Sequence, residues 1–148
     1  MTLYYEDVPA DDSDVPQLPP LLTAVAVPSG QNVHHKAIAL AASSEVGTVF
    51  YSEAVDRMHI AVVLGPEVAV ADASQMLFAM MIGIGDAIGA LAPPEVAVSY
   101  QMPGYILLNK GLAGFVRMAV DPAVGADSVP DWMVVSAEIT LTTPDLSE

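Results

Sequence analysis

The longest apolar stretch of the sequence, Asp72 to Leu91, restricts most strongly what this chain can fold into. It holds a run of Met, Leu, Ile and Phe side chains, but Asp72, Gln75, Asp86 and three glycines interrupt it. A membrane-spanning helix needs about 20 predominantly apolar residues, and these polar residues leave a shorter apolar core. We therefore predict a buried helix that is capped by Asp72 and packs across a β-sheet.

The glycines of this stretch, Gly83, Gly85 and Gly89, invite a comparison with nucleotide-binding motifs. Ile88 stands where the dinucleotide fingerprint G-x-G-x-x-G needs its last glycine, and no strand precedes the segment. The pattern therefore does not indicate a dinucleotide site. Gly85 and Gly89 are four residues apart, and we expect them to let the helix approach the sheet closely.

The rest of the chain alternates between helix and strand patterns, with no linker or internal repeat. Val33, Ala37 and Ala41 recur at helical spacing and predict a helix over residues 32–43. An apolar stretch at 21–27 ends at a turn signal. The first two strands have a short connection, which predicts an antiparallel hairpin. The expected strands cover residues 48–51, 58–64, 96–100, 106–108, 112–120 and 132–142.

The alternation of side chains is cleanest in the last of these strands. One face carries Met133, Val135, Ala137, Ile139 and Leu141, and the other carries Trp132, Val134, Ser136, Glu138 and Thr140. Such alternation predicts a sheet with one buried face and one wet face. The expected fold class is α+β, with a mainly antiparallel mixed sheet and helices packed on one face.

Charge and composition exclude several classes of function. The 148 residues include 4 Lys+Arg against 18 Asp+Glu, a formal net charge of -14, so nucleic acid and anionic membranes are not expected partners. There is no cysteine, which removes disulfides, thiolate metal sites and a cysteine nucleophile. The N-terminus lacks the cationic and apolar regions of a signal peptide, so we expect a cytoplasmic protein. Residues 1–20 have the pattern of an acidic, proline-rich arm, and 144–148 that of a tail.

No arrangement of side chains predicts a metal site or a catalytic residue. His34 and His35 are adjacent on the expected helix and cannot form an i, i+4 pair, while His59 lies on a separate strand. The acidic run at 11–14 lacks the glycine and the distal glutamate of an EF-hand loop. The serines stand in no G-x-S-x-G context.

The stretch from Ser99 to Gly114 carries the most specific signal in the sequence. It resembles the core motif of biotin/lipoate-protein ligases, K-W-P-N-D-I-L-V-N-G-x-K-L-A-G-I. Pro103, Asn109 and the apolar positions 106–108 and 112–114 match this motif. The Lys and Trp of the motif are replaced by Gln101 and Met102, and its Asn-Asp pair by Gly104 and Tyr105. The order of expected elements over residues 21–143 also follows the catalytic domain of that family, without its final strands and helices.

This resemblance implies a chemistry that can be checked against the residues present. Such ligases activate a carboxylate with ATP and pass the acyl group to a lysine of a carrier domain, so cations must neutralise phosphate charge. The Gly/Arg-rich loop of the family is replaced by residues 52–57, which contain no glycine and only Arg57. Related octanoyl transferases use a cysteine, which this chain lacks. The resemblance therefore implies a degenerate, non-catalytic domain, a pseudoenzyme, with ATP and biotin or lipoate as cofactors by family resemblance alone.

The same resemblance places a ligand-binding pocket for a small acyl-type carboxylate. Its expected residues are Tyr51, Glu53, Gln101, Met102, Gly104, Tyr105, Lys110 and Gly114. Lys110 and Arg117 are the cations that could meet a carboxylate. Two alternatives stay open: an active ligase or acyltransferase completed by residues or a partner outside this chain, and a structural module that forms a homodimer through exposed sheet edges.

Overall fold

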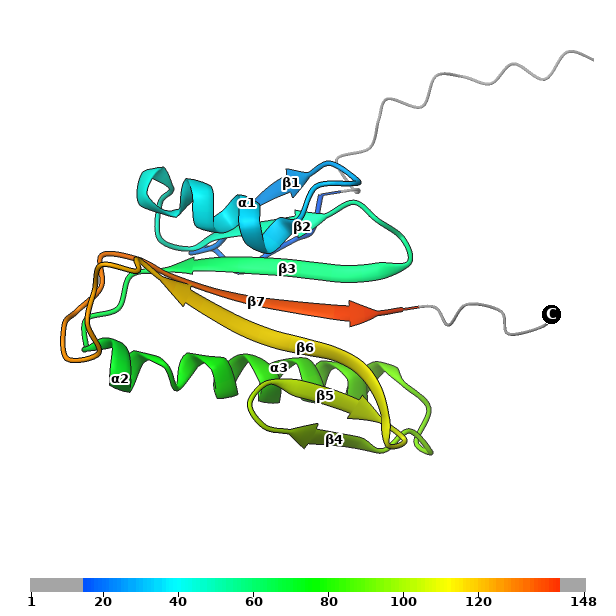
Figure 1. Ribbon diagram of the computed structural model, residues 1–148. Helices are drawn as coiled ribbons and strands as arrows, with labels where there is room; N and C mark the ends of the chain where they lie inside the picture. The colour runs from blue at the N-terminus through cyan, green and yellow to red at the C-terminus, as the bar shows by residue number, and fades with distance from the viewer. Residues whose placement is uncertain (1–14, 142–148) are drawn as a thin grey trace, which may run out of the picture.

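The computed structural model describes residues 15–141. Most of the expected acidic arm, the C-terminal tail and Thr142 lie outside these residues. The described chain forms one seven-stranded mixed sheet, in the order β1-β2-β3-β7-β6-β5-β4 (Figure 1). The strands are β1 (Thr23–Val27), β2 (Thr48–Ser52), β3 (Arg57–Leu64), β4 (Val98–Gln101), β5 (Tyr105–Leu108), β6 (Gly111–Val120) and β7 (Met133–Thr140). The helices are α1 (Val33–Leu40), followed by the 3-10 turn η2 (Ala41–Ser43), then α2 (Val70–Ala73) and α3 (Met76–Leu91).

The α+β class and the mainly antiparallel mixed sheet are confirmed. The predicted hairpin is β2 and β3, which pair antiparallel. The apolar stretch at 21–27, to which the pattern assigned no class, contains β1, and β1 pairs parallel with β2. The helix α1 connects these two parallel strands as a crossover. Asn32 caps α1, because its side-chain oxygen accepts a hydrogen bond from the His35 amide at 3.0 Å.

The two main helices lie on opposite faces of the sheet, so the expectation of helices on one face was wrong. Val134 packs with α1 in one buried cluster, and its neighbours Met133 and Val135 pack with α3 in the other. Val134 and Ser136 are 0% and 1% exposed, which means that the face expected to be wet is covered along most of β7. The cause is the central position of β7, whose two faces are both covered by helices. We call these two faces the α1 face and the α3 face.

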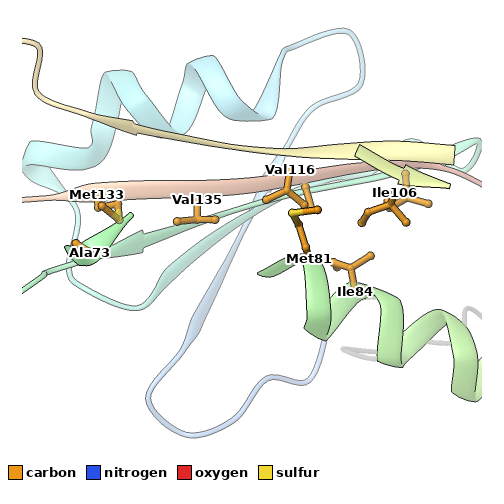
Figure 2. Close-up of a cluster of buried hydrophobic side chains, with 9 residues drawn as sticks. Ala73, Met81, Ile84, Ile106, Val116, Met133 and Val135 are labelled. Carbon is orange, nitrogen blue, oxygen red and sulfur yellow. The ribbon is translucent and has the colours of Figure 1, made fainter. Parts of the chain in front are cut away.

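The helix α3 buries one side against the sheet. Figure 2 shows Met81 and Ile84 of this helix pointing toward Val116 and Ile106. On its other side, Ile82 is 56% exposed, so the helix packs across the sheet as predicted but is buried on one side only. By length and composition alone, the segment Val70–Leu91 is long and apolar enough to cross a membrane. The core helix of a soluble protein passes the same test.

The start and the glycines of α3 also differ in part from the prediction. Asp72 does not cap the long helix, because it lies inside the short helix α2 and the chain turns before Met76. A Cβ atom at Gly85 would overlap the Tyr100 hydroxyl, so this glycine does allow a close approach to β4. A Cβ atom at Gly89 would have no neighbour within 4 Å, so the lack of a side chain at Gly89 does not serve a close approach to the sheet.

Candidate functional site

A row of side chains crosses five strands on the α1 face. Residues directly opposite each other in antiparallel strands point to the same face of a sheet, and the strand register places one residue of each strand in line. The row runs from β3 to β4 through His59, Glu138, Phe115, Tyr105 and Gln101. The helix α1 packs against β2, β3 and β7, so the far end of the row is open, and Tyr105 is 40% exposed.

The first cavity lies at the β3 end of this row and has a volume of about 340 Å³. It forms where the connection from β1 to α1 meets the connection from β2 to β3. Its lining residues are Gly30, Gln31, Asn32, Ser52, Ala54, Asp56, Arg57, His59 and Glu138. The resemblance to the ligases implies their Gly/Arg-rich loop in the β2–β3 connection, so this cavity lies at the position where that resemblance implies cations.

The charges around this cavity are mostly paired with one another. Arg57 Nη1 lies 2.8 Å from Glu138 Oε1, and Arg57 Nε lies 4.0 Å from Asp56 Oδ2. Burial lowers the pKa of His59, and the nearby Glu138, whose Oε2 lies 3.9 Å from His59 Nδ1, opposes that shift only in part. The cavity walls therefore carry two carboxylates against one guanidinium, and Arg57 already has a carboxylate partner.

A buried histidine lies next to the row. His34 of α1 is 6% exposed, and its Nδ1 lies 2.5 Å from the Ser136 hydroxyl oxygen of β7. Burial is the main reason that the pKa of His34 falls from 6.5 to about 4, and Arg117, His35 and His59 lower it further. His34 is therefore neutral at pH 7. Neither residue of this serine–histidine pair lines the first cavity or the cavity between β5 and β6 described below.

The second cavity lies between β5 and β6 and has a volume of about 240 Å³. Its lining residues are Pro103, Gly104, Tyr105, Phe115, Val116 and Arg117. The guanidinium carbon of Arg117 lies 5.3 Å from the centre of the Phe115 ring. Among residues 15–141, two buried side-chain polar atoms have no hydrogen-bond partner, and these are Arg117 Nε and His59 Nε2.

The structure brings together three of the residues expected to bind a ligand. Gly104 and Tyr105 line the second cavity, and Gln101 stands opposite Tyr105 in the row. Met102 follows directly and is 62% exposed. Glu53 is exposed between Ser52 and Ala54, two residues that line the first cavity.

Three other expected residues lie apart from this group. Tyr51 pairs with Ile60, which packs in the α3-face cluster, so the Tyr51 side chain points away from the row. Gly114 stands opposite Ile139 on the α3 face, where a Cβ atom would overlap the Glu138 carbonyl. Lys110 is exposed in the β5–β6 turn, with a φ of 69°.

The sequence interpretation missed Glu138, His59 and the cavity position of Arg57. Glu138 was assigned to a wet strand face, whereas it is the carboxylate that pairs with Arg57. A polar residue inside an otherwise apolar strand is the signal that could have identified His59. Within residues 15–141 no three His, Asp or Glu side chains gather in a way that could hold a metal ion.

Comparison with known proteins identifies relatives of the whole described fold. A biotin protein ligase-like protein of unknown function from Silicibacter sp. TM1040 is 35% identical, with a TM-score of 0.80 over 89% of this chain and 57% of that one. The apo biotin protein ligase of Aquifex aeolicus has a TM-score of 0.63 over 86% of this chain and 54% of its own, at 11% identity, which speaks for the fold alone. A comparison with curated proteins gave no match.

A family model covers nearly the whole chain. The model of the biotin/lipoate A/B protein ligase family matches residues 18–148. This chain spans slightly more than half the length of the two solved relatives, so the activity of a complete ligase does not transfer with the match. The resemblance in the Ser99–Gly114 segment is thus confirmed by a match over the whole domain, and the chain belongs to the biotin/lipoate A/B protein ligase family.

Proposed function

We propose that this ligase-like domain does not use ATP to activate an acyl group, and that it binds a small acyl-type carboxylate without converting it. The observation that carries this proposal is the ion pair of Arg57 with Glu138. Arg57 is the only cation of the segment that replaces the Gly/Arg-rich loop, and Glu138 already neutralises it. A carboxylate thus stands where a ligase of this family needs positive charge.

The four basic residues of the chain do not form a phosphate site. Arg57 is paired, and Lys36 and Lys110 are exposed on α1 and in the β5–β6 turn. Arg117 lines the second cavity rather than the first. Losing one preorganised donor to a developing negative charge costs about 10² to 10³ in rate, so the loss of several leaves little acyl-adenylate formation. The residues present do not fit bound ATP.

The second cavity supports the binding half of the proposal. It places one guanidinium beside the aromatic rings of Phe115 and Tyr105. Its volume of about 240 Å³ lies slightly below the usual range of pockets for drug-sized ligands, about 300 to 1,000 Å³. A monocarboxylate with a short apolar chain matches this combination of one cation, two rings and limited space.

A pyrophosphate-exchange assay tests the catalytic half directly. Biotin, lipoate and octanoate are offered with ATP and Mg²⁺, and an active biotin protein ligase serves as the positive control. We expect exchange no faster than in a reaction without protein. ATP-dependent exchange by this chain alone contradicts the proposal, and exchange that begins only when a second protein is added supports the alternative of a ligase completed by a partner.

A thermal-shift titration with the same acids tests the binding half. A ligand that binds only the folded state stabilises it by RT ln(1 + [L]/Kd), so the melting temperature rises steadily with ligand concentration. We expect this rise for at least one of the acids and no comparable rise with ATP. A rise with ATP alone contradicts the proposal.

A further inference from the structure

We propose that Arg117 is the residue that binds the ligand carboxylate, with the acyl chain lying against Phe115 and Tyr105 in the cavity between β5 and β6. This inference rests on the proposed function, because it names the group that recognises the ligand. It also commits to a class: a monocarboxylate with an apolar chain, and no phosphate-bearing compound.

The first reason is the missing partner of Arg117. Its Nε atom is buried and has no hydrogen-bond partner among residues 15–141. No carboxylate of those residues lies within ion-pair distance of its guanidinium either. A buried donor without an acceptor is costly, and in folded proteins such groups are rare. A ligand carboxylate that accepts from Nε and from one Nη of Arg117 satisfies this donor.

The second reason is that the neighbouring carboxylate is already engaged. Arg117 stands opposite Ser136, so Glu138 is its diagonal neighbour on the α1 face. One oxygen of Glu138 accepts from Arg57 at 2.8 Å, and the other faces His59. Glu138 is therefore held on the β3 side of the row. In a chain with 18 acidic residues, an arginine left without a carboxylate in its own cavity is notable, because ion pairing would be easy to achieve.

The third reason is the character of the surrounding groups. His34 and His59, the two buried histidines nearest this part of the sheet, are both disfavoured as cations. Among the residues that line the second cavity, Arg117 is the one with a full charge, which suits a single negative charge on the ligand. The Phe115 and Tyr105 rings, with Pro103, supply an apolar wall for the rest of the ligand. A polyphosphate would meet the strong negative potential of a chain with a net charge of -14.

Nuclear magnetic resonance of the intact protein tests the assignment without a substitution in the site. The chain has only two arginines, so its spectrum contains two Nε–Hε resonances, and an Arg57→Gln variant identifies which one belongs to Arg117. On titration with octanoate, we expect the Arg117 resonance to shift in a saturable way while that of Arg57 changes little. A spectrum in which neither resonance responds, or only that of Arg57, overturns the inference.

Affinity measurements add a chemical control. Octanoate should bind the wild-type protein at least about tenfold more tightly than octanamide, its neutral counterpart, a factor that corresponds to about 1.4 kcal/mol. Arg117→Gln should remove this preference, and Lys36→Gln, which deletes one exposed cation from α1, should preserve it. Equal octanoate affinity in the wild-type and Arg117→Gln proteins refutes the assignment.

The two proposals fail in different ways. ATP-dependent exchange with wild-type protein contradicts the proposed function, whereas the Arg117 assignment then still stands on the response of its resonance. Conversely, the protein could be inactive in exchange and bind octanoate, lipoate and biotin without any response of the Arg117 resonance. This result would support the non-catalytic proposal and overturn the assignment of the carboxylate to Arg117.

Discussion

Acidification should destabilise this fold through His34. The histidine is 6% exposed, and its pKa falls from 6.5 in the unfolded chain to about 4 in the folded protein, chiefly because of burial. Between these two values the unfolded state binds a proton that the folded state does not. The contribution of His34 to stability is therefore fully present above pH 6.5 and is lost as the pH falls toward 4.

The size of the effect follows from the two pKa values. Between pH 7 and pH 5, proton linkage for one such group lowers the free energy of unfolding by about 2 kcal/mol. The pKa of His59 is also lowered, so His59 adds a contribution of the same sign. The acidic surface acts in the opposite direction, because its self-repulsion weakens as carboxylates gain protons near the pI of 4.1.

A comparison of variants isolates the histidine from this background. Urea unfolding can be followed by the fluorescence of the single tryptophan, Trp132, at pH 7 and at pH 5. In His34→Gln, the new amide oxygen can still accept from Ser136 but does not titrate, so we expect this variant to lose about 2 kcal/mol less than the wild type on acidification. His35→Gln, at the exposed neighbouring position, should behave like the wild type. If His34→Gln and the wild type lose the same stability within about 0.5 kcal/mol, which is the size of ordinary surface effects, the reasoning is refuted.

Three further predictions concern packing and charge. Gly114→Ala should lower the free energy of unfolding by about 1 to 3 kcal/mol, because its Cβ would overlap the Glu138 carbonyl. Gly83→Ala, in open space on α3, should raise the free energy of unfolding by up to about 1 kcal/mol. Chemical denaturation measures both changes, and equal effects of the two substitutions would contradict the geometry. Ile106→Ala, at a fully buried position, should cost about 2 to 5 kcal/mol in the same measurement, against about 0.5 kcal/mol or less for Leu112→Ala at a 66% exposed position. Arg57→Gln should cost less than about 1 kcal/mol at low salt and less still in 1 M NaCl, because the Arg57 side chain is 52% exposed and its ion pair is screened; a larger, salt-independent loss would show that the pair is structurally essential.

The sequence predicted most of the elements but less of their arrangement. Period-2 alternation identified the two faces of β7, yet it could not tell that Val134 and Ser136 would be covered, because small and apolar side chains suit either environment. The capping role assigned to Asp72 was wrong because the chain turns again before Met76, and no local pattern marks that turn. Local patterns therefore predict strands and helices, whereas the identity of the covering layer depends on distant contacts.

The candidate site was harder to predict for the same reason. Gly104 and Tyr105 were found because they lie within one local motif. Their neighbours across the row, Glu138 and His59, join them only through the order β3-β7-β6-β5. This order places His59 opposite Glu138, 79 positions further along the chain. Tyr51 was predicted to line the ligand pocket because of its position in the chain. It pairs with Ile60, however, and its side chain therefore points to the opposite face of the sheet. Knowledge of the strand order was the missing step.

The position of β7 has a consequence for how the fold is reached. This strand, last in chain order among the described residues, is inserted between β3 and β6 and is the only strand that joins them. Until β7 is in place, the sheet consists of two separate pieces with no backbone hydrogen bonds between them. Its pairing with β3 closes a long loop, and such non-local contacts form slowly. We expect folding to be limited by the insertion of β7, and a chain that ends before Met133 to retain at most disconnected sheet fragments.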